Sequence, residues 1–105
     1  MQGTSRSELA AQLQRCARLC EEVSSVYVDR DDARDRDVVS ALLLAAAALD
    51  SACRAIDERA PTVTTALLIA ATLAHDAIEA AERRGLDVTL AHCVAELRAA
   101  AEACG

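Results

Sequence analysis

The strongest constraint on the fold is an apolar stripe near the N-terminus that repeats every three or four positions. It consists of Leu9, Leu13, Cys16, Cys20, Val23 and Tyr27, with steps of 4, 3, 4, 3 and 4. A stripe of this period lies along one face of an α-helix and packs against neighbouring helices. Ser5 and Glu8 precede it in the spacing of a capping box. We therefore expect a first helix over residues 5–28, with Cys16 and Cys20 facing the interior.

Three further segments show the same periodicity and short connections. They cover residues 37–58, 61–84 and 87–104. Pro61 fits the first turn of the third helix, Gly85 fits the position after its end, and Asp87 can cap the fourth. No segment has the alternating pattern of a strand. The 105 residues are thus expected to form one domain, an all-α, up-down-up-down antiparallel four-helix bundle.

Charge and composition limit the function and location of the protein. The formal net charge is -6 and no basic patch is visible, which argues against a nucleic-acid partner. The N-terminus lacks the apolar core of a signal peptide, and the longest apolar run, Ala41–Leu49, is too short for a bilayer span. We expect a cytoplasmic protein without a membrane partner. Its five cysteines should then be reduced, and an odd number also argues against a simple disulfide framework.

Two stretches suggest features beyond the core. Ala41–Leu49 is apolar all round, which predicts either a central helix or a homodimer contact through the second and third helices. Residues 29–37 are dense in charge and are expected to form a solvated connection whose carboxylates suit the start of the next helix. Tyr27, the only aromatic residue, is expected to close the bundle end with its hydroxyl in water.

The cysteines fall at two heights when antiparallel helices are drawn with a rise of ~1.5 Å per residue. One group is Cys16, Cys20 and Cys93, with His75 as a candidate fourth member; the other is Cys53 and Cys104. Thiolates are soft ligands that suit Cu(I) or zinc, and three thiolates with an imidazole form a good zinc set. The spacing is not that of a zinc finger, however, and a buried free cysteine is also an ordinary core residue.

The segment from Leu90 to Cys104 resembles the last helix of the bacterial copper storage proteins, which are cysteine-rich four-helix bundles. His92-Cys93 and the final Cys104 match that helix, Cys16 and Cys20 match the cysteine-rich first helix, and Cys53 matches a thiol near the end of the second. The resemblance implies thiols that line the bundle core and bind Cu(I). Positions where the family would place further thiols are Ala77, Ala81, Ala100 and either Glu96 or Leu97. We therefore expect one or two ions instead of a continuous store, or a divergent member that kept the fold and lost the storage function.

Three functional hypotheses follow. The first is sequestration or transfer of Cu(I), or less readily of zinc, by inward thiolates without turnover. The second is a bundle without metal that acts as a dimeric interaction or scaffold protein. The third is a small enzyme or ligand carrier whose pocket fills the space of the absent cysteines. An enzyme is the least favoured, because no Ser-His-Asp order, nucleophile elbow or Gly-rich phosphate loop is present.

Overall fold

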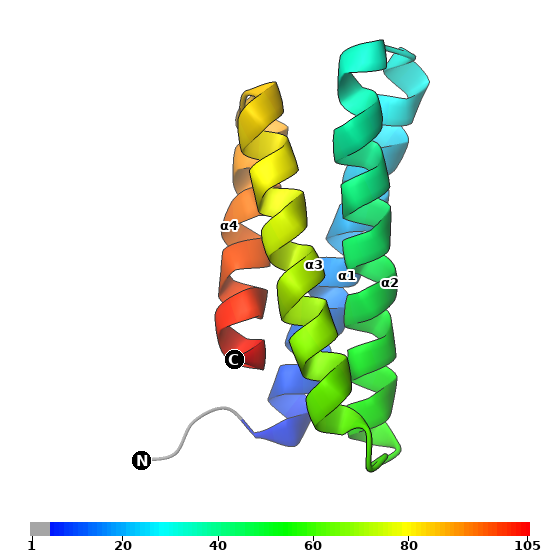
Figure 1. Cartoon of the computed structure of the whole chain (residues 1–105), viewed down its shortest axis with the longest axis vertical. Coiled ribbons are helices and arrows are strands. Elements are labelled where there is room, and N and C mark those ends of the chain that lie inside the picture. Colours follow the sequence, from blue (N-terminus) through cyan, green and yellow to red (C-terminus); the bar gives the residue numbers. More distant parts are fainter. Residues whose placement is uncertain (1–4) are drawn as a thin grey trace.

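The computed structural model describes residues 5–105 as a bundle of four helices (Figure 1). These are α1 (Arg6–Arg30), α2 (Arg36–Asp57), α3 (Val63–Arg84) and α4 (Val88–Cys104), with a 3-10 turn, η1 (Ala33–Asp35), before α2. Each helix packs against the next, and α4 closes the ring against α1. No strand occurs within residues 5–105. The predicted all-α four-helix bundle is confirmed; residues 1–4 of the expected 1–105 domain lie outside the described part.

Local sequence signals set most of the helix ends. The N–H of Glu8 donates to Oγ of Ser5 at 3.2 Å, and the Ser5 hydroxyl donates to Oε1 of Glu8 at 3.0 Å. At the start of α4 the N–H of Leu90 donates to Oδ1 of Asp87 at 2.8 Å. Gly85 ends α3 with a φ of 100°, a region that glycine enters without a Cβ clash. The expected Ser5 cap, the Asp87 cap and the Gly85 stop are therefore confirmed, whereas Glu8 reaches back to the hydroxyl of Ser5 and not to its N–H.

The start of α3 differs from the prediction. Pro61 was expected in the first turn of the helix, but α3 begins two residues later, at Val63. The N–H of Ala60 bonds to the carbonyl of Ala55 at 2.9 Å, and that of Val63 bonds to the carbonyl of Ala60 at 3.2 Å. Two successive turns therefore occupy the connection, and Pro61 lies within them.

The predicted stripes form the core with few exceptions. Leu13, Cys20, Leu42, Leu49, Leu90, Cys93 and Leu97 are each fully buried. From α3 the contribution is small: Ala70, Ala74, Ala77 and Ala81 are also fully buried. Alanine leaves little side chain between two backbones, so the other helices can approach α3 closely. The stripe residues Leu9, Val63, Leu67 and Cys104 are partly exposed.

The stretch Ala41–Leu49 of α2 is apolar all round, which predicts burial on more than one side. Within a single chain, however, part of its surface is exposed. Leu43 and Leu44 are 47% and 57% exposed, because α2 packs only against α1 and α3 and its remaining flank faces outward. On α3, Leu68 and Ile69 are 59% and 50% exposed. By length and composition alone, Ala33–Asp57 and Val63–Arg84 could each cross a membrane, a property that core helices of soluble proteins share.

Candidate functional site

Two thiols from opposite ends of the chain meet in the core. Cys20 of α1 and Cys93 of α4 are both fully buried, and their Sγ atoms are 4.0 Å apart. They meet because the inward stripes of two antiparallel, adjacent helices place them at the same height. The distance is about twice the ~2.05 Å of a disulfide bond, so the two are free cysteines.

Cys16 extends this pair by one turn along α1. Its side chain is 1% exposed and interacts with that of Cys20. The neighbouring hydroxyl of Ser24 is already satisfied, since it donates to the carbonyl of Cys20 at 2.8 Å. We call Cys16, Cys20 and Cys93 the core thiols; they are the set that the helix heights predicted, apart from His75.

The core thiols share protons unequally. The pKa of Cys20 is raised, first by its side-chain interactions with Cys16 and Cys93 and then by burial. The pKa of Cys93 is lowered, because a hydrogen bond from Cys20 stabilises its thiolate more than burial and Glu96 oppose it. The pair therefore loses its first proton more readily than its second, because the thiol that keeps its proton donates to the thiolate beside it. Removing the second proton puts two negative charges in an apolar interior, which only a bound cation would offset.

The distance between Cys20 and Cys93 suits a soft metal ion. Two metal–sulfur bonds of about 2.3 Å span 4.0 Å when they meet at an angle of about 120°. Within residues 5–105 no group of three or more His, Cys, Asp or Glu side chains is arranged to hold a metal ion. The pair is therefore a two-sulfur site as it stands, and Cys16 would become a third ligand only by turning its side chain.

The other predicted ligands are placed differently. His75 is exposed on α3, so its expected role beside the core thiols is wrong. The inward positions of α3 are Ala74 and Ala77, each fully buried, and a helix that buries both turns His75 outward. His92 of α4 is exposed as well.

Cys53 and Cys104 do not form the second thiol group that was expected. Cys53 is buried, its Sγ lies 4.0 Å from Oδ2 of Asp57, and its pKa is raised by burial and then by Asp57. Cys104 is partly exposed at the end of α4, and its pKa is raised by burial and by Cys16 of α1. No interaction among the described residues joins the two, because α2 and α4 lie across the bundle from each other.

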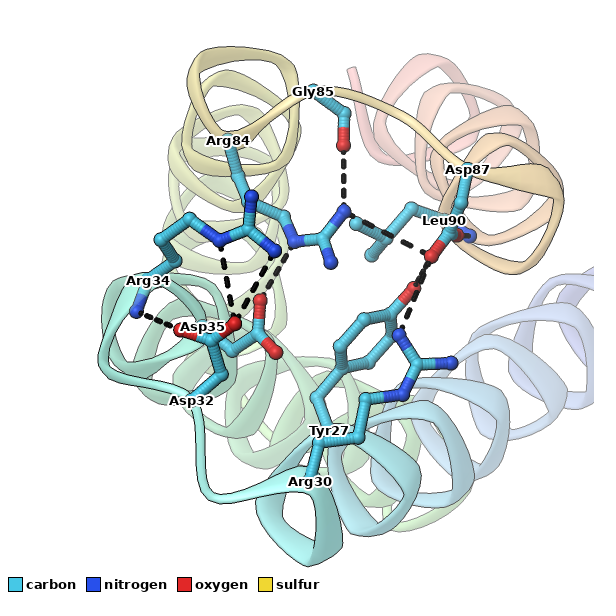
Figure 2. A network of polar contacts seen from close by, with 9 residues as sticks. All are labelled: Tyr27, Arg30, Asp32, Arg34, Asp35, Arg84, Gly85, Asp87 and Leu90. Carbon is cyan, nitrogen blue, oxygen red and sulfur yellow. Dashed lines mark hydrogen bonds and ion pairs between the residues drawn. The ribbon is translucent and has the colours of Figure 1, made fainter.

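A polar cluster closes the bundle at the other end of the core (Figure 2). The hydroxyl of Tyr27 donates to Oδ2 of Asp87, and the guanidinium groups of Arg30 and Arg84 lie 4.4 Å and 5.0 Å from the centre of its ring. Tyr27 is only 1% exposed. The expectation that its hydroxyl lies in water is therefore wrong, because Asp87, the cap of α4, lies directly against it.

Arg84 connects this cluster to the turn before α2. Its Nε donates to Oδ1 of Asp35 at 2.7 Å, and Nη1 donates to the carbonyl of Gly85 at 2.9 Å. The bond to Asp35 raises the pKa of Arg84, while bonds from Tyr27 and then from the N–H of Leu90 lower the pKa of Asp87. Asp35 is 2% exposed, although the charged stretch 29–37 had been expected to be solvated.

The pockets found in the described part of the chain do not include the core thiols among their lining residues. None of five pockets that lie among residues 5–105 is lined by Cys16, Cys20 or His75. The enzyme or carrier hypothesis would be favoured by a deep pocket at these residues, and none of these five pockets provides it.

Comparison with known proteins found no relative of this chain. No family model matches the chain, and neither a curated protein nor a solved structure does. The resemblance to copper storage proteins therefore rests on the cysteine positions and the helix order.

Proposed function

We propose that the protein is a small cytoplasmic bundle that binds a single soft metal ion, Cu(I), between Cys20 and Cys93. The observation that supports this proposal is the 4.0 Å separation of two fully buried sulfur atoms on different helices. Thiolate sulfur is the ligand type that Cu(I) prefers in proteins. The resemblance to copper storage proteins supports the same metal, and zinc is the second choice.

The choice of Cu(I) over zinc rests on its preference for thiolate sulfur and not on the charge of the pair. A bound Cu(I) ion offsets one of two thiolate charges and leaves a single negative charge in the core. With the Cys93 pKa lowered, one ligand is the more easily deprotonated, and the metal displaces the proton that the pair retains. Binding without turnover makes the function sequestration or transfer.

The low thiol number sets the stoichiometry. Cys53 bonds within its own helix and Cys104 lies at the end of α4, so neither extends the core thiols into a second complete site. The proposed capacity is one ion per chain, with Cys16 as a third ligand if its side chain turns toward the metal.

Anaerobic titration with Cu(I) against a strong chelator tests the proposal, with native mass measurement of the metal count. We expect one equivalent to be retained by the unmodified protein and lost in Cys20→Ser and Cys93→Ser. Cys53→Ser is the matched control, because it removes a buried thiol that contacts neither partner. His75→Ala should also retain the ion. Retention of less than one equivalent, or equal loss in Cys53→Ser, would contradict a site at Cys20 and Cys93.

A second candidate function is self-association through α2 and α3. Leu43 and Leu44 of α2 and Leu68 and Ile69 of α3 are each about half exposed or more. Between the two helices lies a groove of about 330 Å³ whose walls include Leu44, Ile69 and Leu73. The large apolar side chains of Leu44, Ile69 and Leu73 line this groove together, and an exposed apolar groove favours a protein partner. A homodimer would use this face on both copies and leave the core thiols unchanged.

A further inference from the structure

A pocket of about 300 Å³ lies where α1 turns into α2, away from the core thiols. The end of α1 contributes Val28, the connection contributes Asp31 and Asp35, and the first turns of α2 contribute Arg36 and Val39. This volume is at the lower end of the range for ligand sites, about 300–1,000 Å³, so the pocket suits a small molecule.

Asp35 gives the pocket an unused hydrogen-bond acceptor. Its Oδ1 accepts from Arg84, but Oδ2 is buried and has no hydrogen-bond partner among the described residues. Figure 2 shows this second oxygen turned away from Arg84, on the side of Tyr27. A buried carboxylate oxygen without a donor is uncommon in folded proteins. A donor that enters the pocket would complete the coordination of Asp35.

We propose that this pocket binds a small primary alkylammonium ion, with its N–H groups donating to Oδ2 of Asp35. An ionised carboxylate can only accept hydrogen bonds, and an ammonium group offers three donors. Asp31 adds a second negative charge at the pocket wall, while Val28 and Val39 offer apolar contact for a short alkyl chain. This proposal does not depend on copper binding.

Neighbouring groups restrict the charge and the chemical type of the ligand further. Asp32 and Arg36 also line the pocket, and Asp32 is already paired with Arg34 at 3.2 Å. Arg36 repels a second positive charge, so we expect a ligand with one ammonium group. Arg30 and Arg84 already cover the ring of Tyr27, which leaves the carboxylate as the recognition element. Calcium takes about six to eight oxygen ligands, so the single free oxygen of Asp35 suits an N–H donor better than a bare metal ion.

An NMR titration of the full chain with n-butylammonium tests the proposal. We expect saturable shifts of the backbone amides of Asp35, Val39 and Ser40. Tetramethylammonium has the same charge without an N–H donor, and n-butanol has a similar alkyl chain without the charge; neither should produce these shifts. Absence of saturation with n-butylammonium, or equal shifts with tetramethylammonium, would overturn the proposal.

Two variants locate the binding site. Asp35→Asn should weaken n-butylammonium binding by at least about tenfold, because it removes the charge from the acceptor. Since this change also weakens the ion pair with Arg84, Val39→Phe provides a second variant that fills the pocket and keeps Asp35. It should abolish the shifts, whereas Leu68→Phe on the exposed face of α3 should leave them intact. Unchanged affinity in Val39→Phe would show that the ligand binds elsewhere.

Discussion

Nε of Arg84 donates to Oδ1 of Asp35 at 2.7 Å, and this bond joins the last residue of α3 to the turn that enters α2. The two side chains are 13% and 2% exposed. Because water cannot replace either partner, the pair differs from the exposed ion pairs of this protein, such as that of Arg54 with Asp50, whose side chains are 73% and 44% exposed.

Replacing Arg84 should therefore destabilise the fold strongly. We expect Arg84→Ala to lower the free energy of unfolding by about 3–5 kcal/mol, since it leaves the carboxylate of Asp35 buried without its partner. Arg54→Ala is the matched control and should cost less than about 1 kcal/mol. Urea denaturation followed by circular dichroism measures both. Equal effects of the two variants would mean that the Asp35 pair is no more important than a surface pair.

Stability should also fall at alkaline pH because of Tyr27. Burial, followed by the bond to Asp87, raises the pKa of Tyr27 from its ordinary value of 10.0 to about 12. A group whose pKa is raised on folding stabilises the fold below its unfolded pKa, and that contribution is lost as pH rises through the folded pKa. The loss should thus occur between pH 10.0 and about 12.

The single aromatic residue makes this measurement direct. Near-ultraviolet absorbance of tyrosinate reports Tyr27 alone, and denaturation at each pH gives the stability. Tyr27→Phe should remove the Tyr27 contribution to the alkaline fall and lower stability at neutral pH by about 0.5–1.5 kcal/mol, because it removes the hydroxyl that donates to Oδ2 of Asp87. Titration of the native tyrosine at its ordinary pKa would contradict a buried hydroxyl.

The five thiols should differ in reactivity. Cys104 is partly exposed and the other four are buried, so we expect one rapid modification per native chain by a maleimide and five after unfolding. The buried thiols should react only as fast as the bundle opens. Mass spectrometry counts the labels. Cys104→Ser should remove the rapid reaction, and rapid labelling of Cys20 or Cys93 would show that the core is open.

The apolar face of α2 and α3 should control self-association. We expect sedimentation to show a dimer that Ile69→Glu weakens by at least about tenfold, since a charge would be buried in the contact. Val88→Glu is the control, because Val88 is 88% exposed at the start of α4 and lies outside this face. A monomer at all concentrations, or an equal effect of Val88→Glu, would exclude this interface.

The sequence predicted the helices and the inward thiols because both depend on periodicity. The stripe from Leu9 to Tyr27 and the cap at Asp87 are local signals, and the structure confirms each of them. The sequence could not predict that Tyr27 bonds to Asp87, which is 60 positions away along the chain. Nor could the sequence show which carboxylate of residues 29–37 is buried. The inward direction of Asp35 depends on the left-handed conformation of Asp31 and on the 3-10 turn η1.

By itself, then, the sequence determined the four-helix bundle, its helix order and the inward direction of Cys16, Cys20 and Cys93, since a heptad stripe has one buried face. Only the tertiary structure decided which of these groups meet. The packing of α1 against α4 brings the sulfur atoms of Cys20 and Cys93 to 4.0 Å, and the exposed face of α3 removes His75 from them. Helix offsets and rotation depend on the fit of many side chains at once, which no local pattern contains.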